Sequence, residues 1–321
     1  MLALVLDEGL DLISEYPRPT PGPEDALIRV RLAGVCSTDL EILRGYRQFR
    51  GVLGHEFVGT VVACDQGEWI GRRVVGDINI GCNECSLCQQ GVYTHCRSRT
   101  AIGILGRDGA LAEFLTLPLS NLLRVPDDVP DEAAVFTEPL AAALQVLGQV
   151  EVGPENRVAV IGDGKLGLLV AQVLATTGAE VTVIGRHPKK LALAAGWGLC
   201  TAQGLDSALR QSEPGTWDLV AECTGNPEGL AAGLELIRPL GTIVLKSTIH
   251  GLSSVDLNRV VVDEIRLVGS RCGPYGTALR WLQAGRVDVT SLIEARYPLA
   301  EGVRALEHAG RRGVLKVLVQ P

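Results

Sequence analysis

A cysteine, a histidine and a glutamate from separate stretches of the chain have the side chains needed to bind one divalent metal ion. His55 and Glu56 follow Gly54, whereas Cys36 lies upstream and Glu138 lies far downstream. Thiolate, imidazole and carboxylate groups are all zinc ligands, and a site with three protein ligands keeps a fourth position open for catalysis. Cys36, His55 and Glu138 therefore predict a catalytic zinc site. Each of them alone would more often be an ordinary packing residue.

Four further cysteines predict a second metal site. They have the spacing C-x2-C-x2-C-x7-C, at Cys82, Cys85, Cys88 and Cys96. The residues between them are mostly polar and turn-prone, which disfavours burial of the sulfurs in an apolar core. Because four thiolates complete a tetrahedral site, this spacing predicts a structural zinc and hence two zinc ions per chain. A redox-active or incidental cluster is the alternative interpretation.

A glycine-rich turn between two apolar runs predicts a dinucleotide site. The strand-like run 157–161 leads into the motif G-x-G-x-x-G at 162–167, residues at helical spacing follow, and 180–184 is again strand-like. In such a unit, backbone N–H groups approach a pyrophosphate at the N-terminus of the helix. The predicted cofactor-binding residues are Gly162, Gly164, Lys165, Leu166 and Gly167. A purely structural glycine-rich turn is the alternative.

The residues after the second of these strands bear on the choice of cofactor. NAD enzymes usually have Asp or Glu there to hold the ribose 2′-hydroxyl, whereas an Arg accommodates the 2′-phosphate of NADP. Here the strand is followed by Gly185, Arg186 and His187, and then by Pro188-Lys189-Lys190, with no acid. The sequence therefore predicts a preference for NADP over NAD, with Arg186, His187 and Lys190 as candidate contacts. The lysines could instead be a solvated first turn of a helix, where positive charge is mildly unfavourable.

The bulk composition limits the classes of partner. The chain has 321 residues, enough for two domains, with a formal net charge of −7 and a pI near 5.4. This acidic balance argues against nucleic acid or an anionic membrane as the main partner. No apolar run reaches membrane-spanning length, and the N-terminus lacks the basic flank of a secretory signal. We therefore expect a cytoplasmic protein, in which nine cysteines indicate metal binding before disulfides.

The elements that must position these residues follow two patterns. Residues 1 to about 125 contain short strand-like runs such as 26–32 and 57–63, bounded by Gly and Pro, which indicates a barrel-like β unit. Helices are expected within 131–149. Strand-like runs then alternate with helical segments, which predicts an open parallel sheet with strands at 157–161, 180–184, 218–223, 241–245 and 264–269. Further predicted elements are helices at 228–238, 278–284 and 303–309 and a last strand at 314–319.

Five features together resemble one known family. They are Gly34-Val35-Cys36-Ser37-Thr38-Asp39, Gly54-His55-Glu56, the four-cysteine segment, Thr137-Glu138-Pro139-Leu140 and the later glycine motif. Their order and spacing resemble those of the zinc-dependent medium-chain alcohol, polyol and glucose dehydrogenases over essentially the whole chain. The implied fold is a GroES-like β-barrel catalytic domain with an inserted Rossmann domain, a doubly wound parallel sheet.

The resemblance also implies boundaries and an association state. It places the catalytic domain with its structural-zinc lobe at 1–139, the Rossmann dinucleotide-binding domain at 140–270, and a return to the catalytic domain at 271–321. It further implies a homodimer or a homotetramer.

The resemblance assigns metal ligands residue by residue. Cys36 and His55 match two ligands of the catalytic zinc, and Glu138 stands where polyol and glucose dehydrogenases have glutamate and alcohol dehydrogenases have a second cysteine. Glu56 is a further candidate. If residues 55 and 56 both lie in extended backbone, their side chains point in opposite directions. Glu56 would then lie beside the metal or bind it transiently.

Three polar residues are candidates for handling the substrate. Thr38 matches the relay hydroxyl of the family and would hydrogen-bond the substrate oxygen. Glu41 stands where many alcohol dehydrogenases have a relay histidine, and a carboxylate there suits a substrate with several hydroxyl groups. Glu113 is a second candidate for that contact. The alternatives are a turn threonine and two solvated surface carboxylates.

Together these features predict a zinc-dependent NAD(P) oxidoreductase. Zinc would lower the pKa of an alcohol and so favour transfer of hydride from its carbon to nicotinamide. A sugar or polyol is the favoured small-molecule substrate, and a simple or aromatic alcohol is the alternative. From a different class, the protein could be a dinucleotide-binding sensor or scaffold without turnover, although the intact set of Cys36, His55, Glu138 and Thr38 argues against it.

Overall fold

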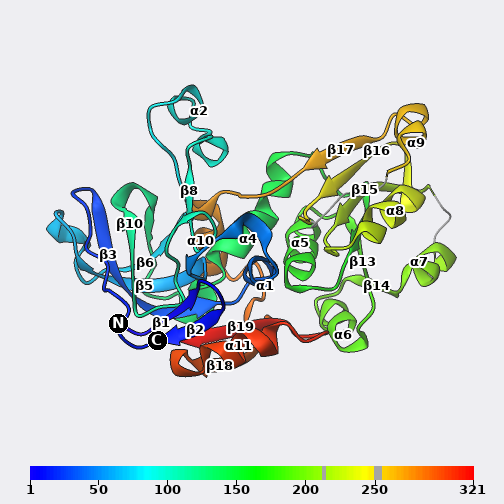
Figure 1. The fold of residues 1–321 in the computed structure, drawn as a ribbon. Helices are drawn as coiled ribbons and strands as arrows, with labels where there is room; N and C mark the ends of the chain where they lie inside the picture. Colours follow the sequence, from blue (N-terminus) through cyan, green and yellow to red (C-terminus); the bar gives the residue numbers. More distant parts are fainter. Residues whose placement is uncertain (212–214, 249–254) are drawn as a thin grey trace. The chain divides into compact units, whose positions relative to one another are not determined.

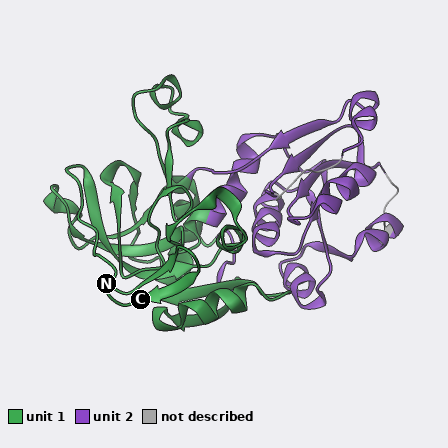
Figure 2. Cartoon of the chain, in the orientation of Figure 1, with its two compact units in different colours: residues 1–138, 275–285, 292–321 green, residues 139–274, 286–291 purple. Residues whose placement is uncertain are grey.

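The computed structural model describes residues 1–211, 215–248 and 255–321. The chain divides into two compact units (Figure 2). Unit 1 comprises Met1–Glu138, Tyr275–Gly285 and Leu292–Pro321, and unit 2 comprises Pro139–Pro274 and Arg286–Ser291. Unit 1 consists mainly of β-strands, whereas strands alternate with helices in unit 2 (Figure 1). The predicted fold class, a β domain combined with a doubly wound α/β domain, is therefore confirmed.

Unit 2 contains a six-stranded sheet in which all neighbouring strands are parallel, in the order β14-β13-β12-β15-β16-β17. The strands are β12 (Arg157–Ile161), β13 (Glu180–Gly185), β14 (Cys200–Gln203), β15 (Trp217–Glu222), β16 (Ile237–Leu245) and β17 (Arg266–Gly269). The chain order runs outward from β12 on one side and from β15 on the other. Sheets of this kind bind ligands at the carboxyl ends of the strands beside that reversal.

The helices of unit 2 connect these strands. They are α5 (Lys165–Ala175), α6 (Pro188–Gly196), α7 (Leu205–Gln211), α8 (Pro227–Leu236) and α9 (Leu257–Val262), preceded by α4 (Thr137–Leu144), which begins in unit 1, and the 3₁₀ turn η5 (Gln145–Gly148). Every residue of α5 from Gly167 to Leu174 is buried, because this helix is apolar almost all round. The apolar periodicity does not predict β14, since Ala202 is the only buried residue of this short, half-polar strand.

The largest sheet of unit 1 has the order β11-β6-β5-β3-β19-β18, with β10 also paired to β3. Its strands are β3 (Asp25–Gly34), β5 (Glu56–Ala63), β6 (Arg73–Gly76), β10 (Phe114–Pro118), β11 (Leu122–Arg124), β18 (Ile293–Pro298) and β19 (Lys316–Gln320). Two small sheets contain β1 (Ala3–Leu6), β2 (Leu10–Ile13) and β4 (Gly51–Val52), and β7 (Asn79–Ile80), β8 (Thr100–Ile102) and β9 (Gly106–Arg107).

The C-terminal strand lies beside one of the first strands of the chain. β19 runs antiparallel to β3, with Leu318 opposite Gly34 and Val319 opposite Ala33. β18 pairs in parallel with β19 and is not predicted by the sequence analysis, because it alternates half-buried with exposed residues and lacks an apolar run. The sheet of unit 1 thus joins segments from both ends of the chain.

The helices of unit 1 are few and short. They are α1 (Ser37–Leu43), α2 (Ser86–Gln89), α3 (Asp131–Ala134), α10 (Tyr275–Gln283) and α11 (Gly302–Ala309). The remaining 3₁₀ turns are η1 (Tyr46–Gln48), η2 (Gly67–Trp69), η3 (Tyr93–His95), η4 (Leu119–Asn121), η6 (Thr290–Leu292) and η7 (Leu299–Glu301). Within the described ranges, no helix has both the length and the apolar character needed to cross a membrane.

Candidate functional site

Three of the predicted metal-site residues lie together in unit 1. Cys36 directly precedes α1, and His55 and Glu56 stand at the start of β5. One ligand atom from each residue, the sulfur, a ring nitrogen and a carboxylate oxygen, lies within 4.8 Å of the other two. The ligand atoms of a tetrahedral zinc site are roughly 3.5 Å apart, so a small closing movement brings these atoms to coordination distance. The residues present therefore fit a zinc ion.

The backbone before β5 explains why His55 and Glu56 face the same site. Gly54 has a φ of 93°, and His55 lies before the first residue of the strand. The alternation of side chains holds inside a strand and does not extend across this turn. Both side chains are buried, with 3% and 1% of their surface exposed, and both belong to the same ligand group. The expectation for two residues in one extended strand therefore does not apply here, and the role of Glu56 at the metal stays a prediction.

Asp39 holds two of these residues in place. Its carboxylate is fully buried, with Oδ1 3.2 Å from Nδ1 of His55 and Oδ2 accepting the backbone N–H of Cys36 at 2.8 Å. Burial lowers the pKa of His55, but the charges of Asp39 and Cys36 outweigh burial and raise this pKa well above its usual value. The contact to Nδ1 leaves Nε2 of the ring available to a metal.

Asp39 ends the motif of residues 34–39, and the sequence analysis assigns it no role. The available signal was the capping box at the start of α1, an acid three residues after the N-cap Cys36.

Lys316 forms a buried ion pair with Glu56. It comes from β19, only 1% of its side chain is exposed, and its Nζ contacts Oε2 of Glu56. Nζ also lies 3.4 Å from the carbonyl oxygen of Val35 and 5.6 Å from the ring centre of Phe136. Burial lowers the pKa of Lys316, but the charges of Glu56 and Cys36 raise it above its usual value overall. Lys316 is therefore charged beside this carboxylate.

The second oxygen of Glu56 has a different environment. Oε1 is buried and has no hydrogen-bond partner within the described residues. A buried carboxylate oxygen without a partner is costly unless a cation or donor satisfies it. This orphaned atom is the strongest sign, on the structure alone, that the group is completed by a cation.

Glu138 lies near this group without belonging to it. The group whose ligand atoms lie within 4.8 Å of one another contains, among the described residues, Cys36, His55 and Glu56. Glu138 stands in the first turn of α4 and is partly buried. Burial raises the pKa of its carboxyl to about 7, against the opposing charge of His55. A cation bound by the group would lower this pKa, so the role of Glu138 as a ligand stays a prediction.

The three predicted substrate-handling residues have different surroundings. Thr38 lies beside the metal group, with Oγ1 3.6 Å from the sulfur of Cys36. Glu41 is partly exposed on α1, and its carboxylate pairs with Arg44 one turn later at 2.6 Å. Glu113 accepts the backbone N–H of Leu2 at 2.7 Å and so anchors the N-terminal segment. Of the three, Thr38 is placed with the ligand group, while the carboxylates of Glu41 and Glu113 already have partners within the chain.

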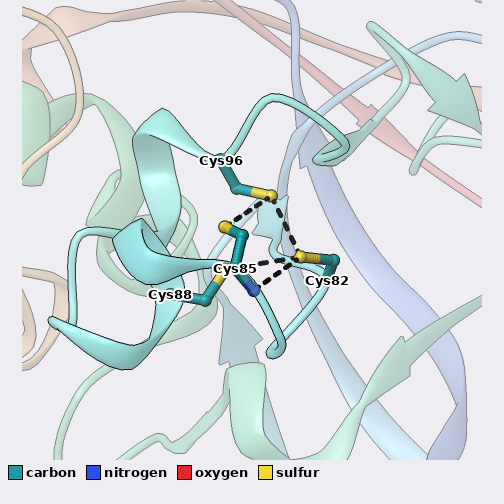
Figure 3. A group of neighbouring side chains, drawn as sticks. All are labelled: Cys82, Cys85, Cys88 and Cys96. Carbon is teal, nitrogen blue, oxygen red and sulfur yellow. Dashed lines mark hydrogen bonds between the residues drawn. The ribbon is translucent and has the colours of Figure 1, made fainter.

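The four cysteines of the second motif form a compact cluster (Figure 3). The Sγ–Sγ distances are 3.5 Å for Cys82 and Cys96, 3.8 Å for Cys85 and Cys96, and 4.0 Å for Cys82 and Cys88. Two sulfurs bound to one tetrahedral zinc lie about 3.8 Å apart, so the cluster already has the dimensions of such a site. Hydrogen bonds from the backbones of Glu84 and Cys85 lower the pKa of Cys82 to about 6, which favours the ligating thiolate.

Within 82–96, Cys96 is the only buried residue, so this lobe has no apolar core of its own. Replacement of Cys88 by Ser should therefore remove one zinc ion per chain and make 82–96 sensitive to proteases. Zinc content by atomic emission and mapping of the cleavage sites would test this. Cys200→Ser, at an exposed position on β14, is the matched control and should change neither result. Full zinc content in the Cys88→Ser protein would contradict a four-thiolate site.

The glycine motif in unit 2 has the geometry of a pyrophosphate cradle. Gly162 has a φ of 118°, and a Cβ on it would lie 2.7 Å from the carbonyl oxygen of Cys223. A Cβ on Gly167 would lie 2.0 Å from the carbonyl oxygen of Gly162, so helix and turn pack directly against each other. A Cβ on Gly164 would meet no atom within 4 Å. Tight turn, close packing and an open approach are the three requirements of a dinucleotide turn, and the motif meets all of them.

The predicted cofactor residues lie around this turn. Lys165 and Leu166 are the first two residues of α5, at the helix N-terminus that follows the glycine turn. Arg186 is exposed just after β13, His187 is half-buried, and Lys190 is buried on α6. The sequence analysis finds no acid at the end of β13, but the structure brings the carboxylate of Asp163 to that point from the glycine turn.

Comparison with known proteins agrees with these observations. Residues 22–127 match the family described as alcohol dehydrogenase GroES-like domain, and residues 166–284 match the family described as zinc-binding dehydrogenase. The chain is 31% identical over 313 residues to an L-threonine 3-dehydrogenase of Chelativorans sp. (strain BNC1), covering 90% of this chain and 89% of the relative. It is 29% identical over 325 residues to an erythritol/L-threitol dehydrogenase of Mycolicibacterium smegmatis, covering 92% and 90% of the two chains.

A solved structure has the same fold over its whole length. It is a protein from Sinorhizobium meliloti 1021, assigned as a zinc-binding dehydrogenase and bound to NADP. The TM-score is 0.87 at 28% sequence identity, covering 100% of this chain and 99% of the other.

Proposed function

Since the chain belongs to the family of zinc-dependent medium-chain dehydrogenases, we propose that it transfers hydride between NADP and a hydroxyl-bearing carbon of a sugar or polyol. The observation that carries this proposal is the group of Cys36, His55 and Glu56, which brings a thiolate, an imidazole and a carboxylate together. The open glycine turn of unit 2 supports the cofactor half of the proposal.

The residues around the ligand group prepare the site for a metal. Cys36, His55 and Glu138 are the proposed ligands of a catalytic zinc, which would supply the Lewis acidity that lowers the pKa of a substrate hydroxyl. Glu56 lies beside this position, and its Oε1 has no partner among the described residues, while Lys316 neutralises its other oxygen. Lys316 thereby limits the negative charge that the site places around a dipositive ion.

Thr38 is the proposed route for the proton. Its hydroxyl lies 3.6 Å from the sulfur of Cys36, one of the residues that would hold the zinc, and its side chain is only partly buried. A hydroxyl can accept one proton while donating another, so Thr38 connects a substrate hydroxyl with solvent. Thr38→Val keeps the shape of the side chain and removes this connection.

A hydroxyl-rich substrate is favoured by the relatives rather than by a built pocket. One relative is named for erythritol and L-threitol, which are both polyols. Glu41 would contact such a substrate only by giving up its ion pair with the exposed Arg44, an exchange that costs little because surface pairs contribute little. Simple or aromatic alcohols are the second candidate, since the metal group serves them equally well.

The experiment that tests the function is reduction of nicotinamide by the zinc-loaded protein, followed by near-ultraviolet absorbance. NAD and NADP are each combined with aldoses, polyols and simple alcohols. Turnover with a sugar or polyol supports the proposal, and turnover with simple alcohols alone replaces the substrate class. A protein that binds zinc and cofactor without turnover on the whole panel would favour a dinucleotide-binding sensor or scaffold.

Arg186 is the residue proposed to select NADP. It is exposed and forms no ion pair within the part of the chain that the structure describes. A guanidinium recognises phosphate through charge-assisted hydrogen bonds. Arg186→Asp should therefore lower the ratio of kcat/KM for NADP to that for NAD by at least about tenfold. Arg259→Asp, at a residue of unit 2 on α9, is the control. An unchanged ratio in the Arg186→Asp protein would remove Arg186 from the cofactor site.

Three further features belong to this proposal. We expect two zinc ions per chain, one in each cysteine-containing group. We expect a homodimer or homotetramer, which sedimentation equilibrium distinguishes from a monomer. We also expect the protein in the cytoplasm, where reduced thiols are maintained.

A further inference from the structure

The carboxylate of Asp163 belongs to the glycine turn but contacts the end of the next strand. Its Oδ2 accepts the backbone N–H groups of Arg186 at 2.8 Å and His187 at 2.7 Å. Nδ1 of His187 lies 3.0 Å from Oδ1 and 3.1 Å from Oδ2. Only 6% of Asp163 is exposed. This side chain therefore connects the turn that approaches the pyrophosphate with the turn that follows β13.

Gly185 shows which space this carboxylate occupies. A Cβ on Gly185 would lie 2.5 Å from both Cβ and Oδ2 of Asp163. The φ of Gly185 lies outside the left-handed region, so glycine is required here for space and not for backbone conformation. Gly185 is the last residue of β13, the position at which NAD enzymes usually carry their acid. The carboxylate of Asp163 thus stands where the side chain of residue 185 would be.

The oxygens of Asp163 are occupied by protein donors. Besides the two backbone N–H groups and the imidazole, Nζ of the buried Lys190 lies 4.0 Å from Oδ1. Burial raises the pKa of Asp163, but the hydrogen bonds from His187 and Arg186 lower it below its usual value overall, so the group is ionised. A carboxylate with these partners is poorly available to a ribose hydroxyl.

The guanidinium of Arg186, unlike the carboxylate of Asp163, is available to a ligand. Its backbone N–H is fixed by Asp163, whereas its side chain is exposed and unpaired within the described ranges. Fixing the backbone reduces the conformational freedom that the guanidinium must lose when it binds an anion. This arrangement raises the affinity for a ligand with a 2′-phosphate, but not for a ligand that has only a 2′-hydroxyl.

We propose that Asp163 is a positioning residue for cofactor selectivity, which anchors the backbone of Arg186 and His187 so that the Arg186 guanidinium receives the 2′-phosphate of NADP. The inference rests on the proposed use of NADP and adds a residue to it. It also explains why an acid is absent at the end of β13, because its space is taken.

The test compares two variants of the zinc-loaded protein by equilibrium titration with NADPH and NADH, which needs no turnover. Asp163→Ala removes the acceptor, and we expect the ratio of NADPH to NADH affinity to fall at least tenfold, mainly through weaker NADPH binding. Asp163→Asn keeps an oxygen for the two backbone N–H groups and an amide that can donate to His187. We expect its ratio to stay within threefold of wild type.

Four outcomes would overturn the inference. Tighter NADPH binding in both variants would mean that the carboxylate repels the phosphate. An equal loss of affinity for NADPH and NADH in Asp163→Ala would mean that Asp163 has a merely structural role. A ratio of NADPH to NADH affinity that is unchanged in this variant, while the wild-type protein binds both cofactors normally, would mean the same. A wild-type protein that binds neither cofactor would overturn the proposed function and the inference together, so the two failures are distinguishable.

A second pair of variants tests the position of the carboxylate independently of any ligand. Gly185→Ala should lower the melting temperature, because its Cβ meets Asp163. Combining it with Asp163→Gly should recover part of that loss, since the clash disappears, although the NADPH preference should stay weak. A Gly185→Ala protein as stable and as selective as wild type would show that Asp163 does not occupy this space.

Discussion

Replacement of Cys36 by Ser should reduce the zinc content from two ions per chain to one and lower hydride transfer roughly a thousandfold. Cys36 supplies the sulfur of the ligand group and lies within 4.8 Å of the ligand atoms of His55 and Glu56. A metal that acts as a Lewis acid contributes several kcal/mol to the transition state, which corresponds to about three powers of ten in rate. Metal analysis and steady-state turnover on the best substrate measure both effects.

The matched control for this experiment is Cys64→Ser. Cys64 is partly exposed, its thiol contacts the carbonyl oxygen of Gln66 at 3.0 Å, and it belongs to neither ligand group. This variant should keep two zinc ions and full turnover. If Cys36→Ser retained both zinc ions, or lost one without losing activity, the group in unit 1 would not be the catalytic site.

The features that sequence predicts here depend on local spacing. The four cysteines from Cys82 to Cys96 lie within one short segment, so their proximity is fixed by a few turns of backbone. The glycine motif at 162–167 likewise describes one turn between one strand and one helix. The parallel sheet follows from alternating apolar runs, most clearly in its central strands β12, β13 and β15, each of which buries all but one of its residues.

The features that sequence misses depend on distant segments meeting. Lys316 lies 260 positions after Glu56 and is a polar residue inside the predicted strand at 314–319, yet it is buried against that glutamate. Asp163 stands at a position that the glycine motif leaves unspecified, yet its carboxylate accepts a backbone N–H group at the end of β13. In both cases the charge is explained by a partner that no local pattern contains.

Glu113 has a contact within the chain that its sequence environment does not predict. It reads as a carboxylate available to a substrate, but it binds the backbone N–H of Leu2. An acidic residue in a β unit has two uses, recognition of a ligand and satisfaction of a backbone donor, and its own sequence environment does not separate them. Only the course of the N-terminal segment past Glu113 decides between the two.

The ion pair of Lys316 and Glu56 is expected to have the largest effect on stability. Replacement of Lys316 by Met leaves the carboxylate of Glu56 buried without its cation. Breaking a buried pair in this way typically costs about 3–5 kcal/mol, whereas an exposed pair contributes about 0.2–1 kcal/mol. The matched control is Arg44→Met, which removes the exposed pair with Glu41 on α1. Urea unfolding of the metal-free proteins, followed by circular dichroism, measures the difference.

A double variant separates the pair from the packing of the lysine stem. Glu56→Gln combined with Lys316→Met removes both charges and should recover most of the stability lost in Lys316→Met alone, because no uncompensated charge is left. A Lys316→Met protein that is no less stable than Arg44→Met would contradict a buried pair of charges. Recovery of stability on adding zinc would have a different meaning. It would show that a metal ion can neutralise Glu56 when Lys316 cannot.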